Sequence, residues 1–295
     1  MKITNKMGLP QSFVEMATRD YQYKPKQYSV TSLLKGTRET ILQRRYHNEI
    51  EEDVADMIWM LWGQAVHHIL EQQKETDVEL KEEYLKVPVI DGYQVSGLFD
   101  LYNHEEQKIT DYKTASVWKI IHEDYAEWKM QLMIYGWMMQ KIGFPVSRGE
   151  VVAVLKDHSK SKAQREQGYP PHPVKKIEWE FSEKNFEAIE DWIEWKFREI
   201  IKAEQLPDHE LPVCSPEERW YTGDKFAVKK KGRKSALRVL NTEEEAQRWM
   251  EQNGKGEWIE HREGTDKKCL NYCRVNKFCR YYQEKYGENK EVRVG

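Results

Sequence analysis

The chain has 295 residues, of which 39% are hydrophobic and 33% charged, and its formal net charge is −3. This length and composition exclude a disulfide-stapled miniprotein and a disordered chain, and they predict a soluble globular protein. No apolar run approaches the roughly 18 residues that span a bilayer, and the first residues lack the apolar segment of a signal peptide. We therefore expect a cytoplasmic protein with no membrane partner.

The first 206 residues predict a domain in which helices and strands alternate. Residues 1–28 are expected to form an extended arm, because Pro10 and Pro25 interrupt any helix. Helical periodicity and capping residues predict helices over residues 29–46, 52–74, 123–143 and 182–204. Short β-rich segments predict strands over residues 84–90, 94–102, 108–114, 150–156 and 175–181. This order indicates an α/β core over residues 29–206.

The composition changes after Pro207, where we place a boundary. A loop with one cysteine is followed by a basic, hairpin-like stretch, a short helix from Thr242 to about Gln252 and a cysteine-rich tail. We predict that residues 207–295 form a second, smaller module.

Two carboxylates and an amine recur at a spacing that suits metal chemistry. Asp100 ends one predicted strand, and Asp111 and Lys113 lie on the next, two residues apart and therefore on one face of it. Across a short hairpin, Asp100 can reach the same face. Such a set suits Mg²⁺ or Mn²⁺, which would polarise a phosphate and lower the pKa of a bound water. The lysine can orient that water or offset the negative charge that develops on the phosphate.

This D…D-x-K pattern resembles the PD-(D/E)xK nuclease superfamily, with Asp111 in place of the commoner Glu. The segment GQAVH at residues 63–67 matches the G-x-x-x-H motif of the RecB-like branch, and QLMIY at residues 131–135 matches its Q-x-x-x-Y motif. The resemblance implies a restriction-endonuclease-like core with a mixed central sheet flanked by helices. It also implies that His67 is an additional metal ligand and that Gln131 and Tyr135 support the catalytic lysine and a DNA phosphate.

Simpler interpretations of the same residues stay open. An Asp-x-Lys pair on a strand is usually a surface ion pair that contributes little. His67 can be a half-buried structural histidine, with His68 the relevant one, and Gln131 and Tyr135 can be ordinary surface and core residues of a helix. The nuclease interpretation depends on all of these motifs occurring in this order.

Four cysteines, Cys214, Cys269, Cys273 and Cys279, form a distant singleton and a C-terminal triplet. Four thiolates bind either zinc or an iron–sulfur cluster. The arrangement resembles the [4Fe–4S] clasp of RecB-like nucleases, namely AddAB-type enzymes, CRISPR-associated exonucleases and certain phage-encoded exonucleases. In the first two groups the lone cysteine precedes the core, whereas Cys214 follows it. Zn²⁺ and unliganded core cysteines are the alternatives.

Residues 225–238 contain seven Lys or Arg residues and no acid. We expect the central basic residues of this segment to bind DNA phosphates; the alternative is that the segment is a solvated hairpin. These central residues are Lys229, Lys230, Lys231, Arg233 and Lys234. The aromatic residues Trp220, Tyr221, Tyr281 and Tyr282 can stack on single-stranded bases or pack around the metal.

Taken together, the residues and the resemblance imply a Mg²⁺-dependent deoxyribonuclease, expected to be an exonuclease, with an iron–sulfur accessory module. Its substrate is DNA, and the resemblance suggests recombination or replication partners and, for a phage-encoded protein, the host cytoplasm. The alternative is a non-catalytic DNA-binding or redox-sensing iron–sulfur protein on a nuclease-like fold. Polarity, strand preference and oligomeric state do not follow from the sequence.

Overall fold

The computed structural model describes residues 1–18, 22–72 and 76–287. The chain divides into two compact units, Met1–Leu206 and Pro207–Gly295, and the division falls where the composition changes. Each unit is described by itself. No helix in the described ranges is long and apolar enough to cross a membrane.

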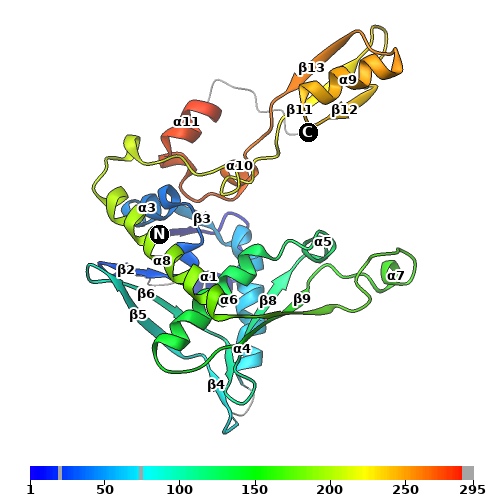
Figure 1. The fold of residues 1–295 in the computed structure, drawn as a ribbon. Helices are drawn as coiled ribbons and strands as arrows, with labels where there is room; N and C mark the ends of the chain where they lie inside the picture. The colour runs from blue at the N-terminus through cyan, green and yellow to red at the C-terminus, as the bar shows by residue number, and fades with distance from the viewer. Residues whose placement is uncertain (19–21, 73–75, 288–295) are drawn as a thin grey trace. The chain divides into compact units, whose positions relative to one another are not determined.

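The N-terminal segment is folded, so the prediction of an extended arm is wrong. Strand β1 (Lys2–Thr4) pairs in parallel with β3 (Glu51–Asp53), and α1 (Gln11–Ala17) begins directly after Pro10 (Figure 1). Proline is tolerated there because it precedes the first helical residue, where a missing N–H breaks no helical hydrogen bond. Ala17 is fully buried in a cluster with Val54 and Met57, which anchors α1 to the unit.

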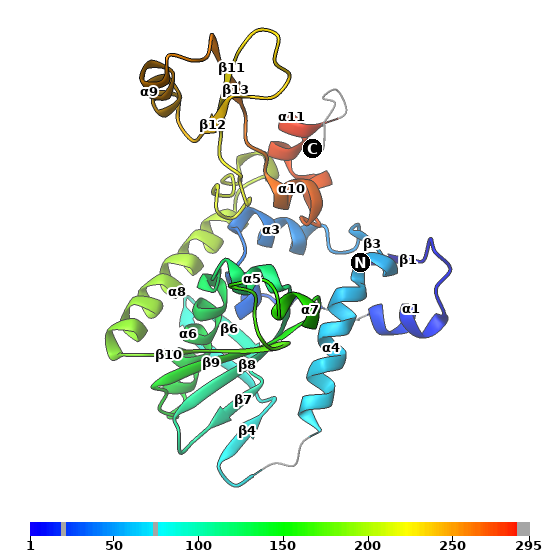
Figure 2. The ribbon, with the colours of Figure 1, turned by 90° about the vertical axis from the view of Figure 1, so that its right-hand side faces the viewer.

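A five-stranded mixed sheet forms the centre of the first unit. Its strand order is β10 (Val174–Glu180), β9 (Arg148–Leu155), β8 (Lys108–Ala115), β7 (Leu101–Asn103) and β4 (Glu79–Lys81). Only β8 and β9 are parallel among these neighbours. Parallel neighbours need a crossover connection, which α5 (Val117–Ile121) and α6 (Ala126–Lys141) supply (Figure 2). The predicted mixed α/β core is confirmed.

A second, three-stranded sheet in the same unit was not predicted. It consists of β2 (Gln27–Ser29), β6 (Tyr93–Leu98) and β5 (Tyr84–Ile90), with β6 in the middle. The expected strand 94–102 is therefore two strands in different sheets, interrupted at Phe99 and Asp100. Phe99 is only 1% exposed, so its ring lies in the hydrophobic core at the point where the chain passes from one sheet to the other.

The helices differ from prediction mainly at their ends. The predicted helix 29–46 is divided into α2 (Val30–Leu33), capped by Ser29, and α3 (Thr37–Arg45). The predicted helix 52–74 is a short 3-10 turn, η1 (Val54–Met57), followed by α4 (Ile58–Glu71). Helix α8 (Glu183–Glu204) begins with the expected capping box of Ser182 and Asn185. The small elements α7 (Lys160–Ala163) and η2 (Asp208–Glu210) lie on either side of it in sequence.

Helix α6 is the centre of the hydrophobic core. It packs against β8, β9 and α8, and its Leu132, Ile134 and Met138 are completely buried. In α8, Ile193 and Phe197 are also fully buried, and the Phe197 ring packs edge-on against Tyr28. Burial on all sides explains why α6 is so apolar for a helix of a globular domain.

The second unit combines a small sheet with a cysteine-bearing region. Strands β12 (Arg238–Leu240), β11 (Lys225–Lys229) and β13 (Trp258–Arg262) form an antiparallel sheet in that order, and α9 (Glu243–Asn253) packs on all three. A capping box of Thr242 and Glu245 starts α9. The chain then continues through α10 (Lys267–Asn271), η3 (Asn276–Phe278) and α11 (Arg280–Tyr286).

Candidate active site

Asp100 and Asp111 occupy facing positions at the start of the β7–β8 hairpin. Leu101 of β7 pairs with Thr110 of β8, so Asp100 lies one residue before the strand and across from Asp111. The backbone N–H of Tyr112 donates a 2.6 Å hydrogen bond to Oδ2 of Asp100, which fixes this carboxylate although it lies outside the strand. Asp100 is close enough for its charge to raise the pKa of Asp111.

The Asp111 carboxylate is 5% exposed and is oriented by two neighbours. Lys113 Nζ lies 2.7 Å from Oδ2 in an ion pair, and Gln131 Nε2 donates a 3.3 Å hydrogen bond to Oδ1. Burial raises the pKa of Asp111 to about 6, although Lys113 acts in the opposite direction. Despite the short ion-pair distance, Oδ2 accepts no hydrogen bond of ordinary geometry from the described residues. This buried oxygen therefore has coordination capacity to spare.

His67 contacts the same cluster from helix α4. Its Nδ1 lies 3.4 Å from Oδ1 of Asp100, and its ring meets that of Tyr112 edge-on with 6.3 Å between centroids. Hydrogen bonding to Asp100 is the largest cause of a raised His67 pKa. His68 is exposed and lies 3.1 Å from the Gln72 amide instead. Of the two histidines, the structure brings His67 to the carboxylates.

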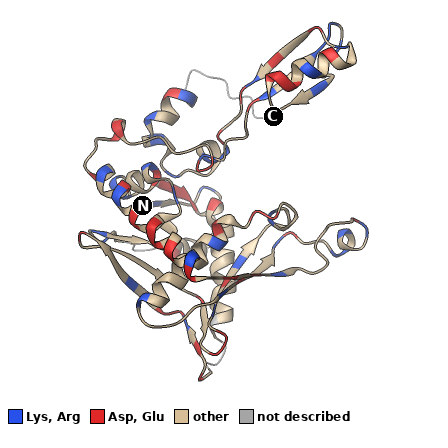
Figure 3. Cartoon of the chain, viewed as in Figure 1, with Lys and Arg blue, Asp and Glu red and all other residues tan. Residues whose placement is uncertain are grey.

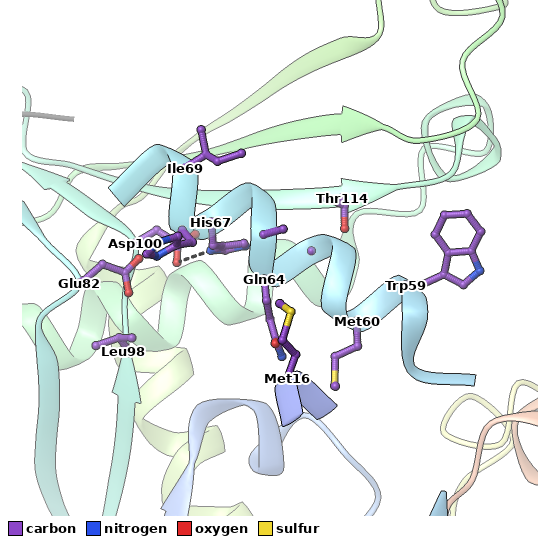
Figure 4. Close-up of a pocket in the computed structure, with 13 residues that line it drawn as sticks. Met16, Trp59, Met60, Gln64, His67, Ile69, Glu82, Leu98, Asp100 and Thr114 are labelled. Carbon is purple, nitrogen blue, oxygen red and sulfur yellow. Dashed lines mark ion pairs between the residues drawn. The ribbon is translucent and has the colours of Figure 1, made fainter. Parts of the chain in front are cut away.

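Glu82 belongs to this cluster, and sequence reasoning missed it. The ligand atoms of His67, Glu82 and Asp100 all lie within 4.8 Å of one another, and Figure 4 shows the three side chains meeting between α4 and the strands. Glu82 has a positive φ of 49°, and its backbone N–H donates to the carbonyl of Asp100. Nothing in the sequence distinguishes Glu82 from Glu83. Glu82 thus joins His67 and Asp100 as a candidate ligand, Asp111 forms an ion pair with Lys113, and the predicted ligand set of His67, Asp100 and Asp111 stays a prediction.

A pocket of about 770 Å³ opens beside this cluster. Helix α4 forms much of its lining, with Trp59, Gln64 and His67, and Asp100 and Glu82 lie at its edge (Figure 4). Gly63 permits close packing of α4 on β8, because a Cβ there would lie 3.2 Å from Oγ1 of Thr114. The cluster is therefore accessible from an open, partly apolar groove.

Gln131 and Tyr135 share a face of α6 but have different surroundings. Gln131 contacts Asp111, as described above. Tyr135 is 5% exposed and packs against β6, where a Cβ on Gly97 would lie 2.6 Å from its Cε1 atom. Burial raises the pKa of the Tyr135 phenol, which therefore stays protonated. Its contact with a DNA phosphate stays a prediction.

The four cysteines lie within the second unit. Cys214 precedes the basic hairpin, Cys269 is in α10, Cys273 follows it, and Cys279 caps α11. Burial raises the pKa of Cys269 to about 12, and Asp266, Cys214 and Cys279 act in the same direction. Cys214 thus acts on the pKa of Cys269 although the two lie 55 residues apart in sequence, and binding of a metal group by the four cysteines stays a prediction.

A buried ionic network joins the segment of the lone cysteine to that of the triplet. Arg219 Nε donates a 2.8 Å hydrogen bond to the Cys214 carbonyl, and Arg219 Nη1 lies 2.5 Å from Oδ1 of Asp266. Asp266 is completely buried and also accepts 2.8 Å hydrogen bonds from Tyr281 and Tyr286. Polar groups buried this deeply need such full satisfaction. The network therefore joins the segment of Cys214 to the segment that precedes Cys269.

The basic and aromatic residues that the sequence predicts to bind DNA lie in the second unit. Lys229 ends β11, and the remaining basic residues, Lys230, Lys231, Arg233 and Lys234, are exposed in the turn that follows. Trp220 is 49% exposed and lies against Tyr272, with 5.2 Å between ring centroids. Tyr221 and Tyr281 pack around the Arg219 guanidinium.

The sequence matches no protein family and no curated protein. Several solved structures resemble the fold, among them the following three. The protein SSO0001 is 17% identical, with a TM-score of 0.42 over 64% of this chain and 82% of its own. An alkaline exonuclease from Laribacter hongkongensis is 14% identical, with a TM-score of 0.37 over 60% and 89% of the two chains. A phage-related exonuclease from Haemophilus somnus is 11% identical, with a TM-score of 0.28 over 65% and 78%. Because these identities and TM-scores are low, the function of this protein has to be argued from its own residues.

Proposed function

We propose that the protein is a divalent-metal-dependent DNA nuclease, and specifically an exonuclease. The observation that carries the proposal is the convergence of Asp111 and Lys113 from strand β8, Asp100 from the residue before β7, and His67 from helix α4. The sequence interval between His67 and Lys113 contains two β-hairpins, so their approach is a product of the fold. A surface Asp–Lys pair does not account for an aspartate that is 5% exposed and also bonded to Gln131.

The donor set fits a hard divalent cation. Mg²⁺ and Mn²⁺ prefer carboxylate oxygens, and an octahedral ion with ligands at 2.0–2.1 Å places neighbouring ligand atoms about 3 Å apart. The 3.4 Å between His67 Nδ1 and Asp100 Oδ1 is close to that separation. His67, Glu82 and Asp100 would hold the ion, and the buried Oδ2 of Asp111, which accepts no hydrogen bond of ordinary geometry from the described residues, would offer a further ligand atom.

The side chains divide the chemistry among them. A bound cation would polarise the phosphate and lower the pKa of a coordinated water. Lys113, held 2.7 Å from Asp111, is placed to orient the attacking water and to offset negative charge on the phosphate. Gln131 keeps the Asp111 carboxylate in a fixed orientation. Tyr135 packs closely against Gly97 of β6.

A direct test compares wild type with Asp111→Ala and Lys113→Ala on linear and closed-circular DNA. We expect the wild-type protein to degrade linear DNA with Mg²⁺ or Mn²⁺ and to leave closed circles intact. Both variants should lose the activity on linear DNA. Equal cleavage by all three proteins would contradict the proposed site. Cleavage of circles would contradict the exonuclease assignment alone. Binding of DNA without any metal-dependent cleavage would favour the non-catalytic alternative.

We further propose that Cys214, Cys269, Cys273 and Cys279 hold a [4Fe–4S] cluster that stabilises the second unit. The proposal is supported by the raised pKa of Cys269, on which Cys214 and Cys279 both act, and by the Arg219 contacts that join the Cys214 carbonyl to Asp266. Ligation needs thiolates, so binding of the cluster would release the protons that burial otherwise favours. A Zn²⁺ site uses the same donors and is the competing assignment, which metal analysis distinguishes.

A further inference from the structure

The β11–β12 hairpin has a strongly basic turn, which we call the basic tip: Lys229, Lys230, Lys231, Arg233 and Lys234. The four residues after Lys229 are exposed, and Gly232 in their midst has a positive φ of 78° that closes the turn. No carboxylate of the described residues lies within ion-pair distance of Lys230, Lys231 or Lys234, although Lys229 lies 3.7 Å from Glu260. The tip is therefore a concentration of largely uncompensated positive charge.

Strand register shows which end of this small sheet lies next to the basic tip and which end lies far from it. Lys229 pairs with Trp258 at the tip end, whereas Lys225 pairs with Arg262 at the far end. Strand β12 runs away from the tip, so α9 begins at the far end with Glu243, Glu244 and Glu245. The helix then returns toward the tip, where Lys255 follows it. Figure 3 shows basic residues at the hairpin turn and acidic residues on α9.

The hairpin is supported rigidly enough to present this charge. Ala227 and Val228 of β11 and Ala246 of α9 are completely buried between the sheet and the helix. Glu257, just before β13, accepts a 3.1 Å hydrogen bond from the backbone N–H of Lys231 and fixes the start of the turn. A pre-ordered contact surface loses less conformational entropy on binding than a mobile tail.

We propose that the basic tip binds the phosphate backbone of the DNA substrate. A protein partner would need buried apolar or aromatic anchors, and residues 230–235 contain none. A polyanion needs only spaced cations, and a two-stranded β-ribbon is narrow enough to enter the major groove of duplex DNA. The inference depends on the proposed function only for the identity of the polymer.

The test measures DNA affinity of the full chain at several salt concentrations with EDTA present, so that no cleavage occurs. The tip variant is Lys230→Gln, Lys231→Gln and Lys234→Gln. The matched control is Lys225→Gln, Arg248→Gln and Arg262→Gln, which removes the same charge from other parts of the module. The probe is a fluorescein-labelled blunt duplex, followed by anisotropy.

Three phosphate contacts contribute about 2.7 to the slope of log affinity against log salt. We expect the tip variant to lose this slope, so that wild type weakens about forty-fold more than the variant between 50 and 200 mM salt. The control should keep the wild-type slope, and thermal unfolding should be alike for both variants. Equal slopes for tip and control variants would overturn the proposal. If the protein cleaves no DNA but the tip variant still loses the salt dependence of DNA affinity, the nuclease function is contradicted and DNA binding by the basic tip is not.

Discussion

Gln131 Nε2 donates a hydrogen bond to Asp111 Oδ1 over 3.3 Å and so joins helix α6 to strand β8 inside the first unit. The other oxygen of Asp111 faces Lys113. The orientation of this buried carboxylate is thus determined from both sides before any substrate binds. Such preorganisation is what electrostatic catalysis requires of its charged groups.

Replacing Gln131 with Leu should weaken metal-dependent cleavage about 10- to 100-fold, the usual cost of losing a partner of a metal-site residue. We expect the metal concentration for half-maximal activity to rise, with partial recovery at high metal. Gln140→Leu is the control, because Gln140 is exposed on the same helix and its side-chain amide donates to the Val146 carbonyl. An unchanged metal requirement in Gln131→Leu would remove Gln131 from the site.

Glu82→Gln should raise the concentration of Mn²⁺ needed for activity and lower the number of ions bound with measurable affinity. The reason is that Glu82 contributes one of the three ligand atoms that meet within 4.8 Å. The neighbouring Glu83→Gln removes the same charge from an exposed position and serves as the matched control. Isothermal titration with Mn²⁺ measures the effect without DNA, and identical titrations for the two variants would show that Glu82 is no ligand.

Cys214→Ser should abolish the visible absorbance of anaerobically purified protein and reduce both iron and sulfide content. Since binding of a metal group to folded protein adds to stability, its thermal unfolding midpoint should fall as well. Ser215→Ala, at the adjacent residue, is expected to retain the cluster. A colourless wild-type protein with stoichiometric zinc would instead assign the site to Zn²⁺.

Asp224 makes acid stability of the second unit testable. The Gly264 N–H, the Tyr221 hydroxyl and His261 bond to its carboxylate and hold its pKa well below the ordinary value. The contribution of a lowered folded-state pKa is complete above the unfolded pKa of about 3.9, and it is lost as the pH falls from there through the folded-state pKa. Asp224→Asn should therefore unfold at a lower temperature than wild type at about pH 5, and calorimetry should show this gap narrowing below about pH 4 and closing only when the pH falls below the folded-state pKa. A gap of constant size would mean that the charge of Asp224 does not contribute.

The sequence predicted the helices and the mixed sheet because their signals are local. Periodicity gave α6 and α8, and the capping pair of Ser182 and Asn185 marked the start of α8 correctly. The folded N-terminal segment was missed because β1 gains its stability from pairing with β3, 49 residues away. Only tertiary contacts decide such short strands.

The candidate site shows the same limit. Asp100, Asp111 and Lys113 could be selected because a fixed spacing on strands carries information. Glu82 could not, since its membership depends on a left-handed backbone conformation and on the exit of β6 from its sheet. The ion pair between Lys113 and Asp111 follows from strand alternation, but the burial of Asp111 depends on α6 packing above it.

Asp100 stands where the chain leaves β6 of one sheet and enters β7 of another, next to the buried ring of Phe99. Its carboxylate is consequently sensitive to the angle between the two sheets. A small rotation of either sheet would change the separation between Asp100 and His67, which belongs to neither. Cation affinity in this protein is thereby coupled to the packing of residues that touch no ligand. Substitutions in the core around Phe99 should therefore change the affinity of the candidate site for a cation.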